Sequence, residues 1–400
     1  MAEKIVLAYS GGLDTSVAVK WMQEKHAAEV ITVTVDVGQQ EDLKQVEENS
    51  KKVGAVKHYS VDAKEEFVKD YVFRAIKANG LYEEKYPLSS ALSRPLIVNK
   101  LVDIARKEDA TALAHGSTGK GNDQVRFDIT IRSLAPDLKI VAPIREWNLS
   151  RDEEIKYAEK NGIPIPVDLD NPYSIDQNLW GRSIECGVLE DPAHEPPEEI
   201  FEWTVSPEKA PSEPEFISIG FEHGVPASVD GKKISPLEIV RTLNARAGRH
   251  GVGRVDHMED RLVGIKSREC YECPAATVLL EAHKELEKTV LTRHELSFKH
   301  QVDVQWTFLA YAGLWMEPLR EDLEGFIDKT QERVTGEVKL KLYKGSATVV
   351  SRSSPFSLYD ANLATYNIET TFDQTWSPGF IEIWGLPTKA ANLLKNKEKR

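Results

Sequence analysis

Cysteine is scarce in this chain of 400 residues, which has only Cys186, Cys270 and Cys273. So few cysteines, and an odd number of them, cannot build a disulfide framework and are typical of a protein from a reducing compartment. Cys270 and Cys273 match the C-x-x-C spacing, but no second cysteine pair follows that could complete a structural zinc site. We therefore expect neither a disulfide framework nor a resident metal site built by these residues.

Clustered positive charge is also missing. The chain has 51 Lys and Arg residues against 64 Asp and Glu residues, a formal net charge of −13, without long blocks of one sign. Nonspecific binding to a nucleic-acid backbone needs gathered Lys and Arg side chains, because they replace the counterions of the phosphates. The charge pattern therefore predicts no nucleic-acid partner.

Long apolar runs are the third absence. None approaches the roughly 18 residues that a membrane-spanning helix requires. The first five residues lead directly into a predicted strand and do not resemble a signal peptide. We expect a cytoplasmic protein with no membrane partner.

Two common phosphate-binding fingerprints, the G-x-x-x-x-G-K-[ST] loop and G-x-G-x-x-G, are absent near the N-terminus. Residues 5–16 instead read Ile-Val-Leu-Ala-Tyr-Ser-Gly-Gly-Leu-Asp-Thr-Ser. Its first three residues fit a buried strand, and Leu13, Val17 and Trp21 then recur as on one helix face. Two glycines and three hydroxyl side chains lie between strand and helix, where the positive end of the helix favours anions. The stretch predicts an anion-binding turn.

Strands and helices alternate after this turn. The pattern predicts strands near 30–38, 56–61 and 111–116 and helices over 40–53, 65–78 and 151–161. A Ser150-x-x-Glu153 capping box opens the last of these helices. A further helix is expected around Pro95, which should either begin it or kink it. Such alternation predicts an α/β fold with a doubly wound parallel sheet, in which ligands bind at the carboxyl ends of the strands. The glycine-containing turn lies at that end.

The length exceeds what one hydrophobic core usually serves, so a second domain is expected. We place the domains at 1–168, 169–375 and a C-terminal arm at 376–400. The second is expected to be an α+β domain. It should contain a hairpin-like pair of strands over 216–229, an Asp230-Gly231 turn, and a helix that begins with a capping box from Ser235 to Glu238 and ends at about 247. Helices over 275–291 and 317–334 and paired strands over 338–350 should follow, and the arm should contain a basic helical tail over 388–400.

A second dense polar cluster, residues 117–128, follows the predicted strand at 111–116. Thr118, Asn122 and Asp123 suit a small zwitterion, because a hydroxyl and an amide can hold its carboxylate and an anion its ammonium group. His115 precedes them and is expected to be a hydrogen-bonded structural residue, since a proton-transfer role would need a specific geometry.

The first turn resembles the pyrophosphate loop of the N-type ATP pyrophosphatases. Together with His-Gly-Ser-Thr-Gly-Lys-Gly-Asn-Asp-Gln-Val-Arg-Phe (115–127), the stretch at 171–183 and the stretch at 259–272, the chain resembles the argininosuccinate synthase family. The resemblance implies an adenine nucleotide alpha hydrolase-like domain and ATP-dependent condensation of citrulline with aspartate, through a citrullyl-adenylate, in arginine biosynthesis. It further implies Mg²⁺ and a homotetramer.

Site residues are implied by the same resemblance. ATP would meet Ala8, Tyr9, Ser10, Gly11, Gly12, Leu13, Asp14, Thr15, Ser16, Val35 and Gly116. Aspartate would meet Thr118, Asn122 and Asp123. Citrulline would meet Tyr86, Ser90, Asn122, Arg126, Ser174, Ser183, Glu259 and Tyr271. Asp14 is expected to serve the cation that accompanies the phosphates, and Asp123 is a hypothesis for the base that deprotonates the aspartate amine.

Two departures and two alternatives remain. Ser90-Ala91 stands where many family members have Thr-Ser, and Val35 where Ala is frequent. Another adenylating ligase of the ATP pyrophosphatase type would use the same first loop, although Cys186 lacks the context of a glutaminase nucleophile. A nonenzymatic nucleotide sensor would need the first loop only, which would leave the cluster at 117–128 without a purpose.

Overall fold

The computed structural model describes residues 3–147, 149, 151–163, 172–367 and 369–397. The chain divides into two compact units, Met1–Phe356 and Ser357–Arg400. The expected domain boundary at residue 168 and the first residue of the expected capping box, Ser150, lie outside the described residues. No helix of the described part is both long enough and apolar enough to span a membrane.

The N-terminal part of the first unit contains a five-stranded parallel sheet in the order β3-β2-β1-β4-β5. Its strands are β1 (Lys4–Ala8), β2 (Glu29–Asp36), β3 (Lys57–Asp62), β4 (Ala112–Ala114) and β5 (Lys139–Val141). The helices around it are α1 (Leu13–His26), α2 (Leu43–Lys52), α3 (Lys64–Glu66), the π-helix η1 (Phe67–Val72), α4 (Phe73–Lys77), α5 (Ser89–Lys107), α6 (Asp123–Leu134), α7 (Pro143–Trp147) and α8 (Arg151–Lys160).

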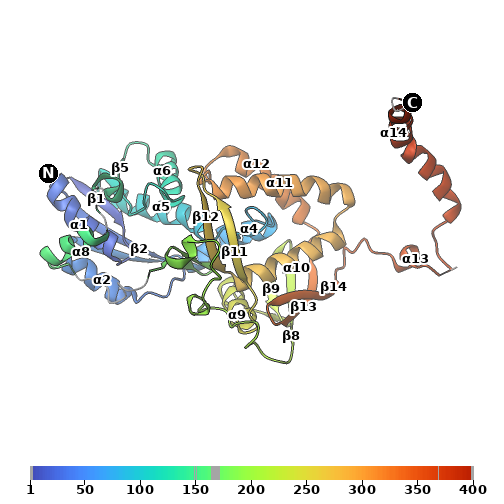
Figure 1. The fold of residues 1–400 in the computed structure, drawn as a ribbon, viewed down its shortest axis with the longest axis horizontal. Coiled ribbons are helices and arrows are strands. Elements are labelled where there is room, and N and C mark those ends of the chain that lie inside the picture. The colour runs from blue at the N-terminus through green and yellow to red at the C-terminus, as the bar shows by residue number, and fades with distance from the viewer. Residues whose placement is uncertain (1–2, 148, 150, 164–171, 368, 398–400) are drawn as a thin grey trace. The chain divides into compact units, whose positions relative to one another are not determined.

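Helices cover both faces of this sheet, as the alternating sequence pattern predicts (Figure 1). Ile5 and Leu7 of β1 belong to a core cluster with α1, α2 and α8, whereas Val6 belongs to the cluster of α5 and η1. Successive side chains of a strand point to opposite faces, so a strand buried on both faces is apolar throughout. The doubly wound α/β fold is confirmed.

Two helices differ from the sequence prediction. The helix expected over 65–78 contains the π-turn η1 in its middle, between α3 and α4. For the second helix we expected Pro95 either to begin it or to kink it; α5 begins at Ser89, so Pro95 lies inside it and only the first alternative is wrong. The reason is a cap from outside the helix, since the Tyr86 hydroxyl accepts hydrogen bonds from the amides of Ser90 (2.9 Å) and Ala91 (3.3 Å).

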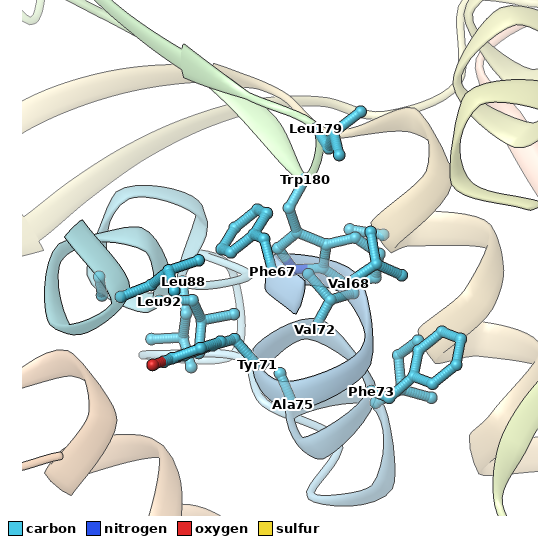
Figure 2. Packing of buried hydrophobic residues seen from close by; sticks show 14 of the residues in the cluster. Phe67, Val68, Tyr71, Val72, Phe73, Ala75, Leu88, Leu92, Leu179 and Trp180 are labelled. Carbon is cyan, nitrogen blue, oxygen red and sulfur yellow. The ribbon is translucent and has the colours of Figure 1, made fainter. Parts of the chain in front are cut away.

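A four-stranded antiparallel sheet in the order β11-β12-β7-β6 follows, which the sequence did not predict. Its strands are β6 (Ser174–Asn178), β7 (Gly181–Glu185), β11 (Arg254–Asp260) and β12 (Lys266–Glu272), and the short 3-10 helices η2 (Gly187–Glu190) and η3 (Glu198–Ile200) come after β7. The turn from β6 to β7 inserts Trp180, which is fully buried, into the core built by η1 and α5 (Figure 2). Its Nε1 donates to the carbonyl of Pro87 at 2.7 Å, which anchors this sheet to the N-terminal half.

The second antiparallel sheet has the order β10-β9-β8-β13-β14. Its strands are β8 (Glu215–Glu222), β9 (Val225–Val229), β10 (Lys232–Lys233), β13 (Gly336–Tyr343) and β14 (Ser346–Ser353). The helices of this part of the chain are α9 (Pro236–Arg249), α10 (Pro274–Val290), α11 (Arg293–Tyr311) and α12 (Pro318–Gln331). The predicted hairpins, the helices at α9, α10 and α12 and the capping box from Ser235 to Glu238 are confirmed. Helix α11 was not predicted.

The second unit, considered by itself, contains α13 (Ala361–Ala364), the 3-10 helix η4 (Gln374–Trp376) and α14 (Ser377–Lys397). None of its described residues is buried. The predicted helical tail is confirmed and begins earlier than the sequence indicated, at Ser377.

Candidate active site

Two neighbouring cavities lie where the carboxyl edge of the parallel sheet faces the sheet β11-β12-β7-β6. The first has a volume of about 290 Å³ and the second about 510 Å³. Residues that line both are Asp14, Gly116, Ser117, Asp123, Ser174 and Asp176. We call the second the nucleotide cavity, since the predicted phosphate loop lines it, and the first the amino-acid cavity. A ligand in one cavity therefore lies beside a ligand in the other.

The loop between β1 and α1 forms one end of the nucleotide cavity. Gly11 has a φ of +83°, a left-handed conformation that glycine adopts without strain. No side chain caps the first turn of α1, so the backbone amides at its positive end are left for an anionic ligand. The hydroxyls of Ser10 and Thr15 lie 3.1 Å apart beside them.

The loop after β4 approaches α1 closely at Gly116. A Cβ atom on Gly116 would lie 3.0 Å from the Cγ2 atom of Thr15. The preceding His115 is fully buried, and its Nε2 lies 2.8 Å from Asp128 Oδ1. Its Nδ1 accepts the backbone N–H of Ser117 at 3.2 Å, so His115 holds the loop and is the structural residue that we expected.

The sheet β11-β12-β7-β6 turns a polar face to the amino-acid cavity. Side chains two apart on a strand share a face, so Tyr271 and Glu269 of β12, and Ser183 and Glu185 of β7, line the cavity together. On β12 the intervening Cys270 is fully buried on the other face, in a small apolar cluster. Burial raises the pKa of its thiol to about 12.

Glu259 is a firmly held carboxylate of the amino-acid cavity. Its two oxygens accept the hydroxyls of Tyr311 and Tyr271, each at 2.6 Å. Asn122 donates to the Tyr311 hydroxyl at 2.8 Å and accepts the backbone N–H of Leu262 at 2.9 Å. The carboxylate is therefore held in one orientation at the cavity wall.

Asp123 joins two arginines. Arg94 donates to its Oδ2 at 2.7 Å through Nη2, and Arg126 donates to its Oδ1 at 2.9 Å through Nη1. Burial alone would raise the pKa of Asp123, but the charges of Arg94 and Arg126 outweigh burial and lower that pKa to about 2. The same Arg94 nitrogen also donates to Asp176 Oδ2 at 2.7 Å, so one guanidinium bridges α6 and β6.

One nitrogen of the Arg126 guanidinium has no hydrogen-bond acceptor among the described residues. The Arg126 side chain is buried, its Nε donates to the Tyr311 carbonyl at 2.9 Å, and its Nη2 is the nitrogen without a partner among the described residues. A buried guanidinium nitrogen without a partner costs free energy unless a ligand satisfies it. Because Arg126 lines the amino-acid cavity, a carboxylate bound there would do so.

A third arginine, Arg261, holds two glutamates. Its Nη2 donates to Glu185 Oε2 at 2.5 Å and to Glu269 Oε1 at 2.8 Å. Ser267 also donates to Glu269 Oε1, at 2.8 Å. Burial and the charge of Glu185 raise the pKa of Glu269 to about 7 despite the opposing contribution of Arg261.

The structure brings most of the residues expected from the sequence to these cavities. Every residue expected to meet citrulline or aspartate lines the amino-acid cavity. Val35 and most of residues 8–16 line the nucleotide cavity, but Gly11 and Ser16 do not, and the Ser16 hydroxyl instead bonds the Tyr9 hydroxyl at 2.9 Å. The ligand roles themselves stay predictions.

Several side chains of the site were missed from the sequence: Arg94, Asp176, Glu185, Arg261, Glu269 and Tyr311. A signal was available for two of them. Glu185 and Glu269 stand two positions from Ser183 and Tyr271, so a strand through either segment places them on the same face. The others depend on contacts between distant parts of the chain.

Comparisons with known proteins agree with this architecture. The model of the arginosuccinate synthase N-terminal HUP domain matches residues 4–164, and that of the arginosuccinate synthase C-terminal domain matches residues 173–391. Argininosuccinate synthase of Pyrococcus furiosus is 61% identical over 392 residues, which are 98% of this chain and 95% of the relative. The argininosuccinate synthase of Rubrobacter xylanophilus is 57% identical over 97% of this chain and 94% of the relative. That of Anoxybacillus flavithermus is 56% identical over 99% of this chain and 98% of the relative. The chain belongs to the argininosuccinate synthase family.

Proposed function

We propose that this chain joins citrulline to aspartate at the expense of ATP, giving argininosuccinate, AMP and pyrophosphate through a citrullyl-adenylate in arginine biosynthesis. The observation that carries the proposal is the wall shared by the two cavities, which would bring the α-phosphate of a nucleotide next to an amino acid. The relatives named argininosuccinate synthase, which match nearly the whole chain, support the choice of substrates.

The nucleotide would bind with its phosphates at the first turn of α1 and its base toward apolar side chains. Val33, Val35, Ile97 and Phe127 supply that apolar lining of the nucleotide cavity. Backbone amides, the Ser10 and Thr15 hydroxyls and the positive end of α1 would hold the phosphates. Because an adenine contact can use backbone atoms, Val35 serves this role as well as a smaller residue.

The residues fit a magnesium ion that arrives with the triphosphate. Asp14 lies in the first turn of α1 and lines both cavities. No group of three His, Cys, Asp or Glu side chains within the described residues is arranged to hold a metal by itself. Mg²⁺ commonly takes one or two carboxylates beside phosphates and water, and Asp14 would be such a ligand. Bound there, the ion would neutralise charge that develops on the phosphates.

Citrulline would bind between Arg126 and Glu259. The unpartnered Arg126 nitrogen would take its α-carboxylate, and the fixed Glu259 carboxylate would take its α-ammonium. Ser174, Ser183 and Ser90 line the same cavity and offer hydroxyls. The Ser90 hydroxyl donates to Asp176 at 2.5 Å, so Ser90 would offer citrulline its oxygen as an acceptor.

Aspartate would bind at Thr118, Asn122 and Asp123, at the junction of the cavities. With a pKa of about 2, Asp123 is an anion at neutral pH, which suits the binding of an ammonium group. A group that releases its proton so readily is a weak base. The earlier hypothesis that Asp123 deprotonates the amine is therefore replaced by a binding role.

Catalysis would depend on positioning. The ureido oxygen of citrulline attacks the α-phosphorus and pyrophosphate leaves, and the aspartate amine then displaces AMP from the adenylate. Neither step needs a nucleophilic side chain, because alignment and charge stabilisation around the phosphates supply most of the rate. The protein's part is to hold three ligands along the shared wall and to receive a proton from the amine.

The assembly and location expected from the sequence belong to the same proposal. We expect a cytoplasmic homotetramer with no nucleic-acid partner, in which 1–168 bind the nucleotide, 169–375 complete the site and 376–400 serve as an arm between subunits. The large apolar side chains exposed in the second unit support the last point, among them Trp376, Phe380, Trp384, Leu393 and Leu394.

Pyrophosphate release tests the proposal. Purified protein with Mg·ATP should release pyrophosphate rapidly only when citrulline and aspartate are both present. Release that needs neither, or that needs a different acceptor, would assign the chain to another reaction of the ATP pyrophosphatase type.

A further inference from the structure

The amino-acid cavity contains a pair of carboxylates that share a single positive partner. Glu185 and Glu269 both accept from the Nη2 atom of Arg261, at 2.5 and 2.8 Å. Glu269 is 6% exposed. Two carboxylates on one guanidinium leave a negative charge without compensation, and burial makes that charge costly. Such a pair therefore binds a proton more tightly than a single solvent-exposed carboxylate does.

Of the other carboxylates of the cavity wall, Asp14 is assigned above to the cation, and the remaining three have strong partners. Glu259 accepts two tyrosine hydroxyls, and Asp123 is paired with two arginines. Asp176 accepts from Arg94 and from Ser90. The oxygens of these three are already occupied by donors, which suits them to binding.

Glu185 lines the cavity that also contains the residues of both predicted amino-acid subsites. It follows Ser183, a residue expected to contact citrulline, by two positions on β7, and both line the cavity. Burial raises its pKa, Arg261 opposes this, and the charges of Asp123 from α6 and Glu259 from β11 raise it further. The carboxylate is thus within electrostatic reach of Asp123, which is expected to bind aspartate, and of Glu259, which is expected to bind citrulline.

The chemistry leaves a role open at this point. An aspartate ammonium must lose a proton before its nitrogen can attack, and no residue has been assigned to accept that proton. The same cavity contains the unpartnered Nη2 atom of Arg126, an independent sign that a ligand with a carboxylate belongs there.

We propose that Glu185 accepts the proton from the aspartate ammonium, and that Glu269 and Arg261 position and tune it. The proposal rests on the function proposed above. In the step, an N–H bond of the ammonium breaks and the proton moves to the Glu185 carboxylate. The amine nitrogen then forms the C–N bond to the ureido carbon of the adenylate, the C–O bond to AMP breaks, and AMP leaves with the electron pair.

The electrostatics of the pair suit this task. The pKa of Glu269 is about 7, raised by burial and then by Glu185, so the pair gains and loses a proton close to neutral pH. A base works best when its proton affinity matches the working pH. The charged groups that act on the pair are Asp123 from α6, Glu259 from β11, Arg261 after β11 and Glu185 and Glu269 themselves.

Glu185→Gln separates this role from binding. Two rates are measured: citrulline-dependent isotope exchange between pyrophosphate and ATP without aspartate, which reports adenylation, and argininosuccinate formation with aspartate present. We expect formation to fall by about 10²–10⁴-fold, the usual contribution of a general base, and exchange to stay within about threefold of the unsubstituted protein. Glu185→Asp should recover part of the lost formation rate.

Controls separate the two proposals. Glu190→Gln removes an exposed carboxylate five positions away and should change neither rate. If the unsubstituted protein shows no citrulline-dependent exchange, the proposed function itself fails. If it does exchange, and Glu185→Gln either lowers both rates together or keeps formation within tenfold, Glu185 is not the proton acceptor.

A second variant serves if Glu185→Gln does not fold. Glu269→Gln removes the neighbouring negative charge, so Glu185 should lose its proton more easily. The acidic limb of the pH–rate profile for argininosuccinate formation should then move to lower pH by at least about half a unit. An unmoved acidic limb would overturn the proposal.

Discussion

At the scale of single residues, Arg126 is a buried, charged side chain with one hydrogen-bond donor that no described residue satisfies. Lysine at this position keeps the charge but cannot bond Asp123, the Tyr311 carbonyl and a ligand carboxylate together. We expect Arg126→Lys to raise the KM for citrulline by about 10–100-fold and to change the KM for ATP much less. Steady-state kinetics in each substrate measure this. Arg132→Lys, at an exposed position of the same helix, should leave both values unchanged.

Glu269 makes a prediction about stability and pH. Its pKa is about 7 in the folded protein against an ordinary value of 4.5, so the folded state binds the proton more tightly than the unfolded state. Stability contributed by the protonated form is therefore complete below pH 4.5 and is lost as the pH rises toward 7. Glu269→Gln should be more stable than the unsubstituted protein by about 1–3 kcal/mol at pH 8, and nearly equal to it at pH 4.5.

Urea unfolding at the two pH values measures this difference. A Glu269→Gln protein that gains no stability at pH 8 would mean that the carboxylate is fully compensated by Arg261. Glu190→Gln, which replaces an exposed carboxylate, should have the same free energy of unfolding as the unsubstituted protein at both pH values.

The sequence could identify those site residues that stand in contiguous motifs. Ser10, Asp14 and Asn122 stand in the segments that lead from an apolar strand into the next helix, so the alternation of strand and helix places them at one sheet edge. Arg94 could not be assigned in this way, because its role depends on contacts with α6 and β6, 29 and 82 positions away. Residues of this kind are visible only when the chain has folded.

At the scale of elements, α10 and α11 are joined by a buried ionic network. Lys299 is 1% exposed and donates to both oxygens of Asp303 (2.8 and 2.9 Å) and to the carbonyl of Lys77 (2.7 Å), and its Nζ lies 3.0 Å from Glu287 Oε1. The network thus ties α11 to α10 and to the end of α4. It lies outside both cavities of the site.

Lys299→Met should lower the free energy of unfolding by about 3–5 kcal/mol, because it leaves two buried carboxylates without their cation. Urea or thermal unfolding measures the loss. The matched substitution Lys288→Met, on exposed surface where the ammonium pairs with Glu285, should cost less than about 1 kcal/mol. Equal losses for the two variants would contradict a structural role for the network.

Elements were predictable where their buried faces are apolar. The parallel strands and α9, α10 and α12 show the expected periodicity. Strands β6 and β12 do not, because Ser174 and Asp176 of β6 and Glu269 of β12 turn a polar face to the cavity in place of the usual alternation. Helix α11 was missed for a related reason, since Lys299 and Asp303 occupy buried positions on it. Polar side chains that face a ligand cavity, or that are buried as ion pairs, interrupt the apolar periodicity from which strands and helices are predicted.

At the scale of the whole molecule, the second unit exposes more apolar surface than a solvated tail needs. Phe380 and Trp384 stack on each other at 5.6 Å on α14 and are 61% and 67% exposed. Replacing both by Asp should convert the proposed tetramer to smaller species, because the buried area between subunits would then contain unpaired charges. Light scattering coupled to gel filtration measures the mass. Lys395→Glu, at an exposed position of the same helix, should leave the mass unchanged, and a double variant of unchanged mass would contradict the arm's role.

The guanidinium of Arg94 lines the nucleotide cavity and is held between Asp123 and Asp176, which line both cavities, and we call these three side chains the partition. A ligand that displaces or tightens this partition from one side alters the environment on the other. Thermodynamic reciprocity then requires that ATP change the affinity for citrulline by the same factor by which citrulline changes the affinity for ATP. A dissociation constant measured for one substrate alone would therefore describe only one corner of a linked cycle.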